Sequence, residues 1–162
     1  MSKTSITLNG TVVTAEVEDR LSLADFIRDQ QGLTGTHLAC EHGVCGACTI
    51  ELDGAPARSC ITLAIAADGK RVNTIEGFDD DALMGILREA FSEAHGLQCG
   101  FCTPGMLITI RDMIQRGVCV SEQKIRLALA GNICRCTGYA GIVKAVKLAV
   151  TRVAERGNHV EA

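Results

Sequence analysis

Residues 40–60 read CEHGVCGACTIELDGAPARSC and hold four of the nine cysteines in this chain of 162 residues. The first three of these cysteines are separated by four and two residues, and eleven residues separate the third from the fourth. A second set of four lies in QCGFC (98–102) and NICRC (132–136). Four thiolates gathered at one point suit iron–sulfur clusters or zinc. The sequence therefore predicts two metal centres, formed by Cys40, Cys45, Cys48 and Cys60 and by Cys99, Cys102, Cys134 and Cys136.

The spacing within the first set indicates the kind of metal centre. Cysteines separated by four and then two residues match the plant-ferredoxin pattern for a 2Fe–2S cluster. Gly43 and Gly46 stand between these cysteines and allow the backbone to approach a cluster closely. Structural zinc sites usually have paired CxxC knuckles, which this set lacks. In the second set, a CxxC pair with a distant CxC pair is compatible with either zinc or a 2Fe–2S cluster.

Composition and charge narrow the class of protein. The formal net charge is −3 and the sequence has no basic run, so nucleic acid is not an expected partner. No segment has 18 continuous apolar residues, and the N-terminus lacks an apolar stretch of signal-peptide length. We therefore expect a cytoplasmic protein that does not enter a membrane. Cytoplasmic thiols stay reduced, so the cysteine content favours metal binding over disulfides.

The first half of the chain is expected to form a small sheet crossed by one helix. Asn9-Gly10 is a strong hairpin signal between two strands, and Asp53-Gly54 is a second turn signal. A helix should begin after Ser22, bury Leu23, Phe26 and Ile27, and end near Gly32. The expected strands cover 5–8, 11–17, 49–52 with a return toward Cys60, 61–66 and 71–75.

The second half changes to helical periodicity after residue 76. We expect one domain over residues 1–76 and another over 77–162, with a frayed tail from Gly157. Cys102 and Cys136 should each stand before a helix, where the positive end of the helix dipole favours thiolates. The expected helices cover 79–94, 103–116 from Thr103-Pro104, 121–129 from a Ser121 cap, and 138–155.

Longer motifs around the cysteines carry a family resemblance. These are CEHGVCGACTIELDG with Cys60, GLQCGFCTPGM, and GNICRCTGY, in this order along nearly the whole chain. The chain resembles the small iron–sulfur subunit of the molybdenum hydroxylases, the xanthine dehydrogenase and carbon monoxide dehydrogenase family. The resemblance implies an α+β protein, in which a β-grasp 2Fe–2S ferredoxin domain precedes a four-helix 2Fe–2S domain. It therefore favours iron–sulfur over zinc at the second set.

The resemblance also implies an electron-transfer role within a larger enzyme. A large subunit would hold molybdopterin near the second cluster, and a medium subunit would hold FAD near the first, in a heterotrimer or dimer of heterotrimers. The residues matching Gln98 and Cys136 lie at the pterin in this family. Electrons would pass from molybdenum through both clusters to flavin or an external acceptor, with no catalytic residue on this chain.

Three further residues and two alternative functions complete the expectations. Cys119 has no ligand role in the family and is expected to be a buried small residue. His42 and His95 are expected at the surface, because each set already has four cysteines.

Some relatives reduce an aromatic thioester, as hydroxybenzoyl-CoA reductase does, instead of hydroxylating a substrate. A free-standing two-cluster electron carrier is an alternative from another class.

Overall fold

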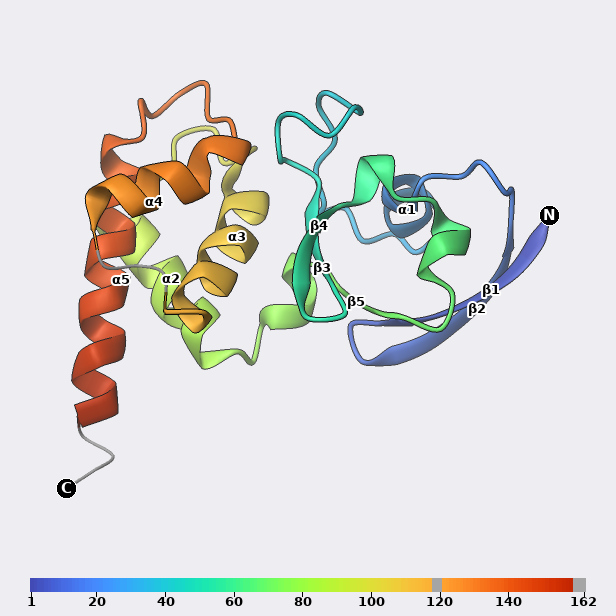
Figure 1. Ribbon diagram of the computed structural model, residues 1–162, viewed down its shortest axis with the longest axis horizontal. Helices are drawn as coiled ribbons and strands as arrows, with labels where there is room; N and C mark the ends of the chain where they lie inside the picture. The colour runs from blue at the N-terminus through green and yellow to red at the C-terminus, as the bar shows by residue number, and fades with distance from the viewer. Residues whose placement is uncertain (118–120, 159–162) are drawn as a thin grey trace.

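A computed structural model describes residues 1–117 and 121–158. The sheet lies at one end of the molecule with the N-terminus, and the helices lie at the other end with the C-terminus (Figure 1). Each end has its own hydrophobic core. The sheet core gathers buried residues between Ile6 and Val72, and the helical core gathers buried residues between Phe78 and Ala149. Cys119 and the last four residues lie outside the described part, so the expectations for them remain predictions.

The sheet has five strands in the order β2-β1-β5-β3-β4. Strands β1 and β5 run parallel, and the other neighbouring pairs are antiparallel. Asn9 and Gly10 both have positive φ, so the expected tight turn joins the first two strands. The Asp53-Gly54 turn has the same property. The strands are β1 (Ser2–Leu8), β2 (Thr11–Val17), β3 (Thr49–Leu52), β4 (Ala55–Arg58) and β5 (Arg71–Asn73).

One helical segment packs on this sheet, as the sequence predicts. The Ser22 hydroxyl accepts a hydrogen bond from the Asp25 amide and caps α1 (Leu23–Asp25). The chain then continues as one π-helical stretch, η1 (Phe26–Gln30), and Gly32 follows with a φ of 69°. Leu23, Phe26 and Ile27 are fully buried. The expected apolar face is therefore confirmed, although the helix is α-helical over its first turn only.

The strand expected over 61–66 is wrong. The chain forms two short 3₁₀ segments instead, η2 (Ser59–Ile61) and η3 (Ala64–Ala67), and Leu63 makes only an isolated bridge to Ser22. Ala64 and Ala67 are both buried, and a spacing of three residues places them on one face of a 3₁₀ turn. Alanine also has low strand propensity. The last strand, expected over 71–75, ends at Asn73, after which Ile75–Phe78 forms the 3₁₀ segment η4.

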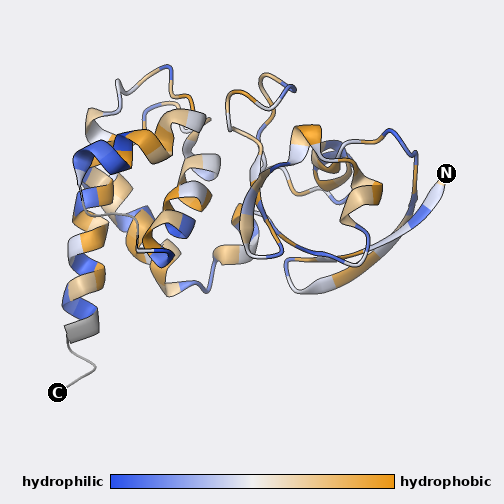
Figure 2. Ribbon diagram, in the orientation of Figure 1, coloured by the Kyte–Doolittle hydropathy of each residue, from blue (hydrophilic) through white to orange (hydrophobic). Residues whose placement is uncertain are grey.

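The described part of the second half contains four α-helices, as expected. Asp81 caps the first helix and Ser121 the third, each accepting a backbone N–H with its side chain. Figure 2 shows both hydrophobic and hydrophilic residues along the last helix, whose Ile142, Val146 and Ala149 are fully buried. That helix continues to Asn158, beyond the expected end at residue 155. The helices are α2 (Ala82–Glu93), α3 (Thr103–Gln115), α4 (Glu122–Ala128) and α5 (Ala140–Asn158), with the 3₁₀ segment η5 (Leu129–Gly131) after α4.

Helix α3 joins the two halves by packing on β3 and β4. Its Arg111 forms ion pairs with Glu51 of β3, at 3.0 Å, and with Asp81, at 2.7 Å. The guanidinium also lies 4.5 Å from the centre of the Phe78 ring. Burial opposes the charge on Asp81, yet hydrogen bonds from Arg111 and the Met84 amide lower its pKa below the ordinary value. Arg111 thus ties a strand to the cap of a helix in the other half.

Within the described residues, no helix is long and apolar enough to cross a membrane.

Candidate metal centres

The first cysteine set is gathered by a tight loop and by the end of a hairpin. Between Cys40 and Cys48 the chain turns through Gly43 and Gly46, whose φ angles are 84° and 76°. The Cys45 amide lies 3.3 Å from the Cys40 sulfur. Ser59 donates to the Cys48 carbonyl through its amide and, at 2.8 Å, through its hydroxyl. This contact holds Cys60 beside Cys48. The loop therefore supplies Cys40 and Cys45, and the two ends of the hairpin supply Cys48 and Cys60.

The thiols of the first set differ in acidity. Backbone N–H groups of Cys45 and His42 lower the pKa of Cys40 to about 6. Burial, together with the neighbouring Cys48 sulfur, raises the pKa of Cys60 to about 11. Cys40 therefore favours the thiolate, whereas Cys60 keeps its proton unless a cation is bound. If all four thiols are ionised, the negative charges repel one another, and a positive core must compensate this repulsion.

The second set comes from two loops of the helical half. Cys102 is the N-cap residue of α3, as the sequence predicts, and Thr103 and Pro104 form its first turn. The sulfur of Cys136 lies 3.4 Å from that of Cys99. All four cysteines of this set line one cavity of about 210 Å³, together with Cys45, Ala39 and Ala47 from the first loop. The cavity therefore lies at the second cysteine set, and the first loop borders it.

The second set has the same division of acidity. Burial and the Cys134 sulfur raise the pKa of Cys102 to about 12. The Phe101 amide lowers the pKa of Cys99, whereas Cys99 in turn raises the pKa of Cys136. Burial opposes the thiolate of Cys134, but hydrogen bonds from Thr137 outweigh it and lower the pKa. Neighbouring sulfurs again compete for protons that a bound cation would displace.

The predicted helix start after Cys136 is wrong. Helix α5 begins at Ala140, and Gly138 and Tyr139 before it both have positive φ, at 60° and 68°. A right-handed helix excludes this conformation. Cys136 therefore lies in a turn outside the helix, and the expected effect of a second helix dipole on this set is lost. Cys102 alone lies at a helix N-terminus.

The thiols of both sets are grouped in pairs. The Cys40 thiol lies with that of Cys45 and Cys48 with Cys60, while Cys99 lies with Cys136 and Cys102 with Cys134. Across residues 1–117 and 121–158, no three His, Cys, Asp or Glu side chains surround one point as single-ion ligands. Two pairs of thiolates are the donor set that two bridged irons require. The residues present therefore fit a 2Fe–2S cluster at each set.

The two cysteine loops contact each other directly. The Ile133 amide donates to the Cys45 carbonyl at 2.8 Å, and the buried Asn132 side chain donates to the Gly46 carbonyl at 3.2 Å. Ile133 precedes Cys134, so one hydrogen bond joins a cysteine of the first set to the residue before a cysteine of the second. We call the contact between residues 45–47 and 131–133 the loop junction.

Residues from two elements, β4 and α3, support the loop junction. Arg58 of β4 donates to the Gly131 carbonyl and to the Thr49 hydroxyl, both at 2.6 Å. Thr109 of α3 donates to the Asn132 side-chain oxygen at 3.1 Å. Gly105 of α3 is also required, because a Cβ there would overlap the Gly46 carbonyl oxygen. The junction is thus fixed from the sheet, from α3 and from both loops.

The structure places the other predicted residues at the surface. Gln98 is exposed, as are Cys99 and Cys136 beside it. His42 and His95 are also exposed, as expected. Sequence reasoning missed Asn132, Arg58 and His37, whose ring stacks on Phe101 between two cysteines of the second set. No local pattern identifies these residues, because the partner that each one contacts in the other half lies more than 60 positions away.

The fold and the two cysteine sets define a two-cluster iron–sulfur protein, and comparison with known proteins agrees. Residues 6–73 match the family described as "2Fe-2S iron-sulfur cluster binding domain", and residues 74–147 match "[2Fe-2S] binding domain". Caffeine dehydrogenase subunit gamma of Pseudomonas sp. (strain CBB1) is 51% identical, covering 88% of this chain and 87% of the relative. Nicotine 6-hydroxylase small subunit of Paenarthrobacter nicotinovorans is 49% identical, covering 87% and 85%. The crystal structure of quinoline 2-oxidoreductase from Pseudomonas putida 86 has a TM-score of 0.88 at 46% identity, covering 96% and 97%.

These relationships establish the family. The chain belongs to the small iron–sulfur subunits of the molybdenum hydroxylases. It is an electron-transfer subunit of a multi-subunit oxidoreductase, and its cofactors are 2Fe–2S clusters. The β-grasp and helical folds expected from the sequence are confirmed, and the family matched by residues 74–147 binds a 2Fe–2S cluster rather than zinc. In the homologous enzymes, molybdopterin and FAD belong to partner subunits.

Two glycine substitutions test the loop junction. Gly105→Ala should destabilise the protein by about 2 kcal/mol, because the new Cβ forces α3 and the Gly46 carbonyl apart. Gly85→Ala in α2 is the matched control, since nothing lies within 4 Å of a Cβ there. It should stabilise the protein by roughly 0.5–1 kcal/mol, through helix propensity alone. Chemical denaturation of both variants measures the difference, and equal effects would contradict the role of Gly105.

Proposed function

We propose that the two cysteine sets are the ligands of the two clusters, one in each domain. Cys40, Cys45, Cys48 and Cys60 hold the cluster of a domain over residues 1–76, and Cys99, Cys102, Cys134 and Cys136 hold that of a domain over residues 77–162. The pairing of the thiols and the separate hydrophobic cores support this division. When bound, each cluster supplies a carrier for one electron. The protein's own contribution is to hold the two centres at a fixed separation, through the loop junction.

The second set is proposed to face the molybdopterin of a large partner subunit. Gln98, Cys99 and Cys136 are all exposed on this side of the helical half, so a partner's cofactor can reach them. Gln98 would offer an amide to hydrogen-bond the pterin, as the family resemblance implies. Cys136 would be the ligand nearest to it. The first set, at the other side of the loop junction, is proposed to face FAD.

Exposed apolar side chains support docking at both sets. Of the nine large apolar residues that are exposed in the described part of the chain, six lie within three positions of a cysteine of either set. We call the exposed apolar residues near the first set, Val44, Ile61 and Leu63, the first rim. The Ile61 side chain lies against Gly43, where a Cβ would overlap it. Apolar surface concentrated in this way marks sites of protein association. The second rim consists of Leu97, Phe101 and Ile133.

Two rims at two sets favour two different partner subunits over a free-standing carrier. We propose a complex with a large molybdopterin-binding subunit and a medium FAD-binding subunit, as a heterotrimer or a dimer of heterotrimers. A carrier that shuttles between enzymes needs one exposed cluster edge and gains nothing from a second apolar rim. Electrons would enter at the second set and leave from the first, toward FAD or an external acceptor.

The substrate class is proposed from the relatives. Caffeine, nicotine and quinoline, in the names of the three proteins compared above, are all nitrogen heterocycles. We propose that the complex hydroxylates a nitrogen-containing aromatic ring oxidatively, with water as the oxygen source. The alternative, reduction of an aromatic thioester, has no counterpart among these three names.

Serine substitutions test the assignment of the ligands. The purified complex should contain about four irons per copy of this chain, two in each cluster. Cys45→Ser and Cys102→Ser should each lose about two of these irons, because each removes one ligand from a different centre. Substrate should still reduce molybdenum in both variants, whereas reduction of flavin should collapse. Cys119→Ser is the control and should keep its irons; normal flavin reduction in an assembled Cys102→Ser complex would refute the electron path.

Charge substitutions test the two rims. Ile61→Glu should weaken association with the FAD-binding subunit, and Phe101→Glu association with the molybdopterin-binding subunit, each by about tenfold or more. Burying a carboxylate in an apolar contact is unfavourable. Leu127→Glu on α4 is the matched control, because Leu127 is 75% exposed and lies outside both rims. Binding measured with each separate subunit should show two independent losses; equal binding by all three variants would argue against docking at the rims.

A substrate screen tests the proposed chemistry. The purified complex, with an artificial electron acceptor, should oxidise purine, pyridine or quinoline rings faster than aliphatic aldehydes. Oxygen from labelled water should appear in the product. Activity confined to the reductive direction with an aromatic thioester would overturn the substrate class, while leaving the role of this subunit intact.

A further inference from the structure

The sulfur of Cys134 has a hydrogen-bond environment unlike that of the other cysteines. The Thr137 hydroxyl lies 3.1 Å from it, and the Thr137 amide lies 3.5 Å from it. Among the eight cysteines, and as far as the described residues go, no other sulfur accepts a bond from a side-chain hydroxyl. Cys134 is also buried, so solvent competes little for this bond. The second set therefore has one ligand whose charge is stabilised by a neighbouring side chain.

The direction of the Thr137 hydroxyl bond is fixed by a second contact. The Tyr139 amide donates to the Thr137 hydroxyl oxygen at 3.1 Å. An amide can only donate, so it occupies an acceptor site on that oxygen. A ligand thiolate has no proton of its own to donate, so the hydroxyl hydrogen of Thr137 donates to the Cys134 sulfur. Gly138 and Tyr139 both have positive φ, which turns the chain back so that this amide can reach Thr137.

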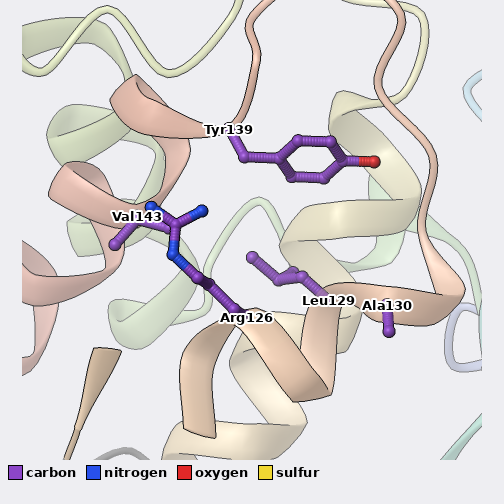
Figure 3. Close-up of a pocket in the computed structure, with 5 residues that line it drawn as sticks. All are labelled: Arg126, Leu129, Ala130, Tyr139 and Val143. Carbon is purple, nitrogen blue, oxygen red and sulfur yellow. The ribbon is translucent and has the colours of Figure 1, made fainter. Parts of the chain in front are cut away.

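The Tyr139 ring holds the rest of the loop in place. Its hydroxyl accepts a hydrogen bond from the Cys134 amide at 2.9 Å and donates to the Asn132 carbonyl at 3.0 Å. Figure 3 shows the ring projecting from the start of α5 over Leu129, with its hydroxyl pointing away from Arg126 and Val143. The Tyr139 hydroxyl thus engages the Cys134 amide, while the Thr137 hydroxyl and amide, together with the Cys136 amide, act on the Cys134 sulfur.

We propose that Thr137 raises the reduction potential of the second centre through its hydroxyl. The inference rests on the proposed function, in which Cys134 is a ligand of that centre. Reduction adds one electron from the molybdenum side, and the Thr137 hydroxyl keeps its proton throughout. A hydrogen bond to a ligand sulfur favours the more negative, reduced state. Thr137 is thus a positioning residue that makes the second centre a better acceptor of the electron.

The test compares Thr137→Val with Thr137→Ser in the assembled complex. Valine keeps the branched shape and removes the hydroxyl, whereas serine keeps the hydroxyl. At a fixed ambient potential, Thr137→Val should lower the ratio of reduced to oxidised second centre about tenfold, since bonds to charged groups are strong. For a one-electron couple this is a shift of about 59 mV toward negative potential. Redox titration followed by electron paramagnetic resonance measures both centres, and the first is the internal control.

The outcomes separate this proposal from the function on which it rests. A shift confined to the second centre in Thr137→Val and absent from Thr137→Ser supports the role of the hydroxyl. An unchanged potential in Thr137→Val overturns it, as do equal shifts of both centres or a shift of the same size in Thr137→Ser. Thr137→Ala provides a second variant if valine disturbs the loop. If Thr137→Val and Thr137→Ala both lose the second centre while Thr137→Ser keeps it, the hydroxyl serves to retain the cluster, and its role in setting the potential is overturned. Iron loss in Cys102→Ser tests the ligand set independently.

Discussion

The carbonyl groups of Cys45 and Gly46 accept hydrogen bonds from the loop that carries Cys134, and this contact determines how the two halves fit together. A loop wrapped tightly around a metal centre exposes carbonyl groups on its outer side, and buried carbonyls need partners. Here the partners come from the second cysteine loop. The same hydrogen bonds that satisfy one loop thus fix its distance from the other, so the separation of the two centres is built into the backbone.

The positions of small residues and of one arginine follow from this contact. Gly105 lets the first turns of α3 lie against Gly46, and α3 in turn presents Arg111 to Glu51 and Asp81. Arg111 is largely buried, and removing one partner of such a network is costly because the remaining charges lose their compensation. The helical half therefore contacts the sheet half at the loop junction, at Arg111 and where the His37 ring stacks on Phe101.

Local features of the sequence predicted local structure well. The cysteine spacings, the Asn9-Gly10 turn, the Ser22 and Ser121 caps and the Thr103-Pro104 helix start all act within a few residues, and each is found in the structure. The failures have physical causes. Residues 61–66 are apolar without alternation, so burial of Ala64 and Ala67 decided their conformation. The start of α5 was misplaced because Tyr139 adopts positive φ, which is uncommon outside glycine and is held here by its hydroxyl bonds to the cysteine loop.

The site residues that sequence reasoning missed are those that depend on both halves at once. Asn132 and Arg58 are polar residues in ordinary surroundings along the chain, and they gain a role only when the loops meet. The cysteines themselves are unequal for the same reason: Cys134 and Cys48 are buried toward the junction, whereas Cys99 and Cys136 are exposed. The proposed electron path between two partner subunits needs both properties, a closed interior between the two cysteine sets and exposed edges toward the partners' cofactors. The junction provides the first, and the exposed cysteines with their apolar rims provide the second.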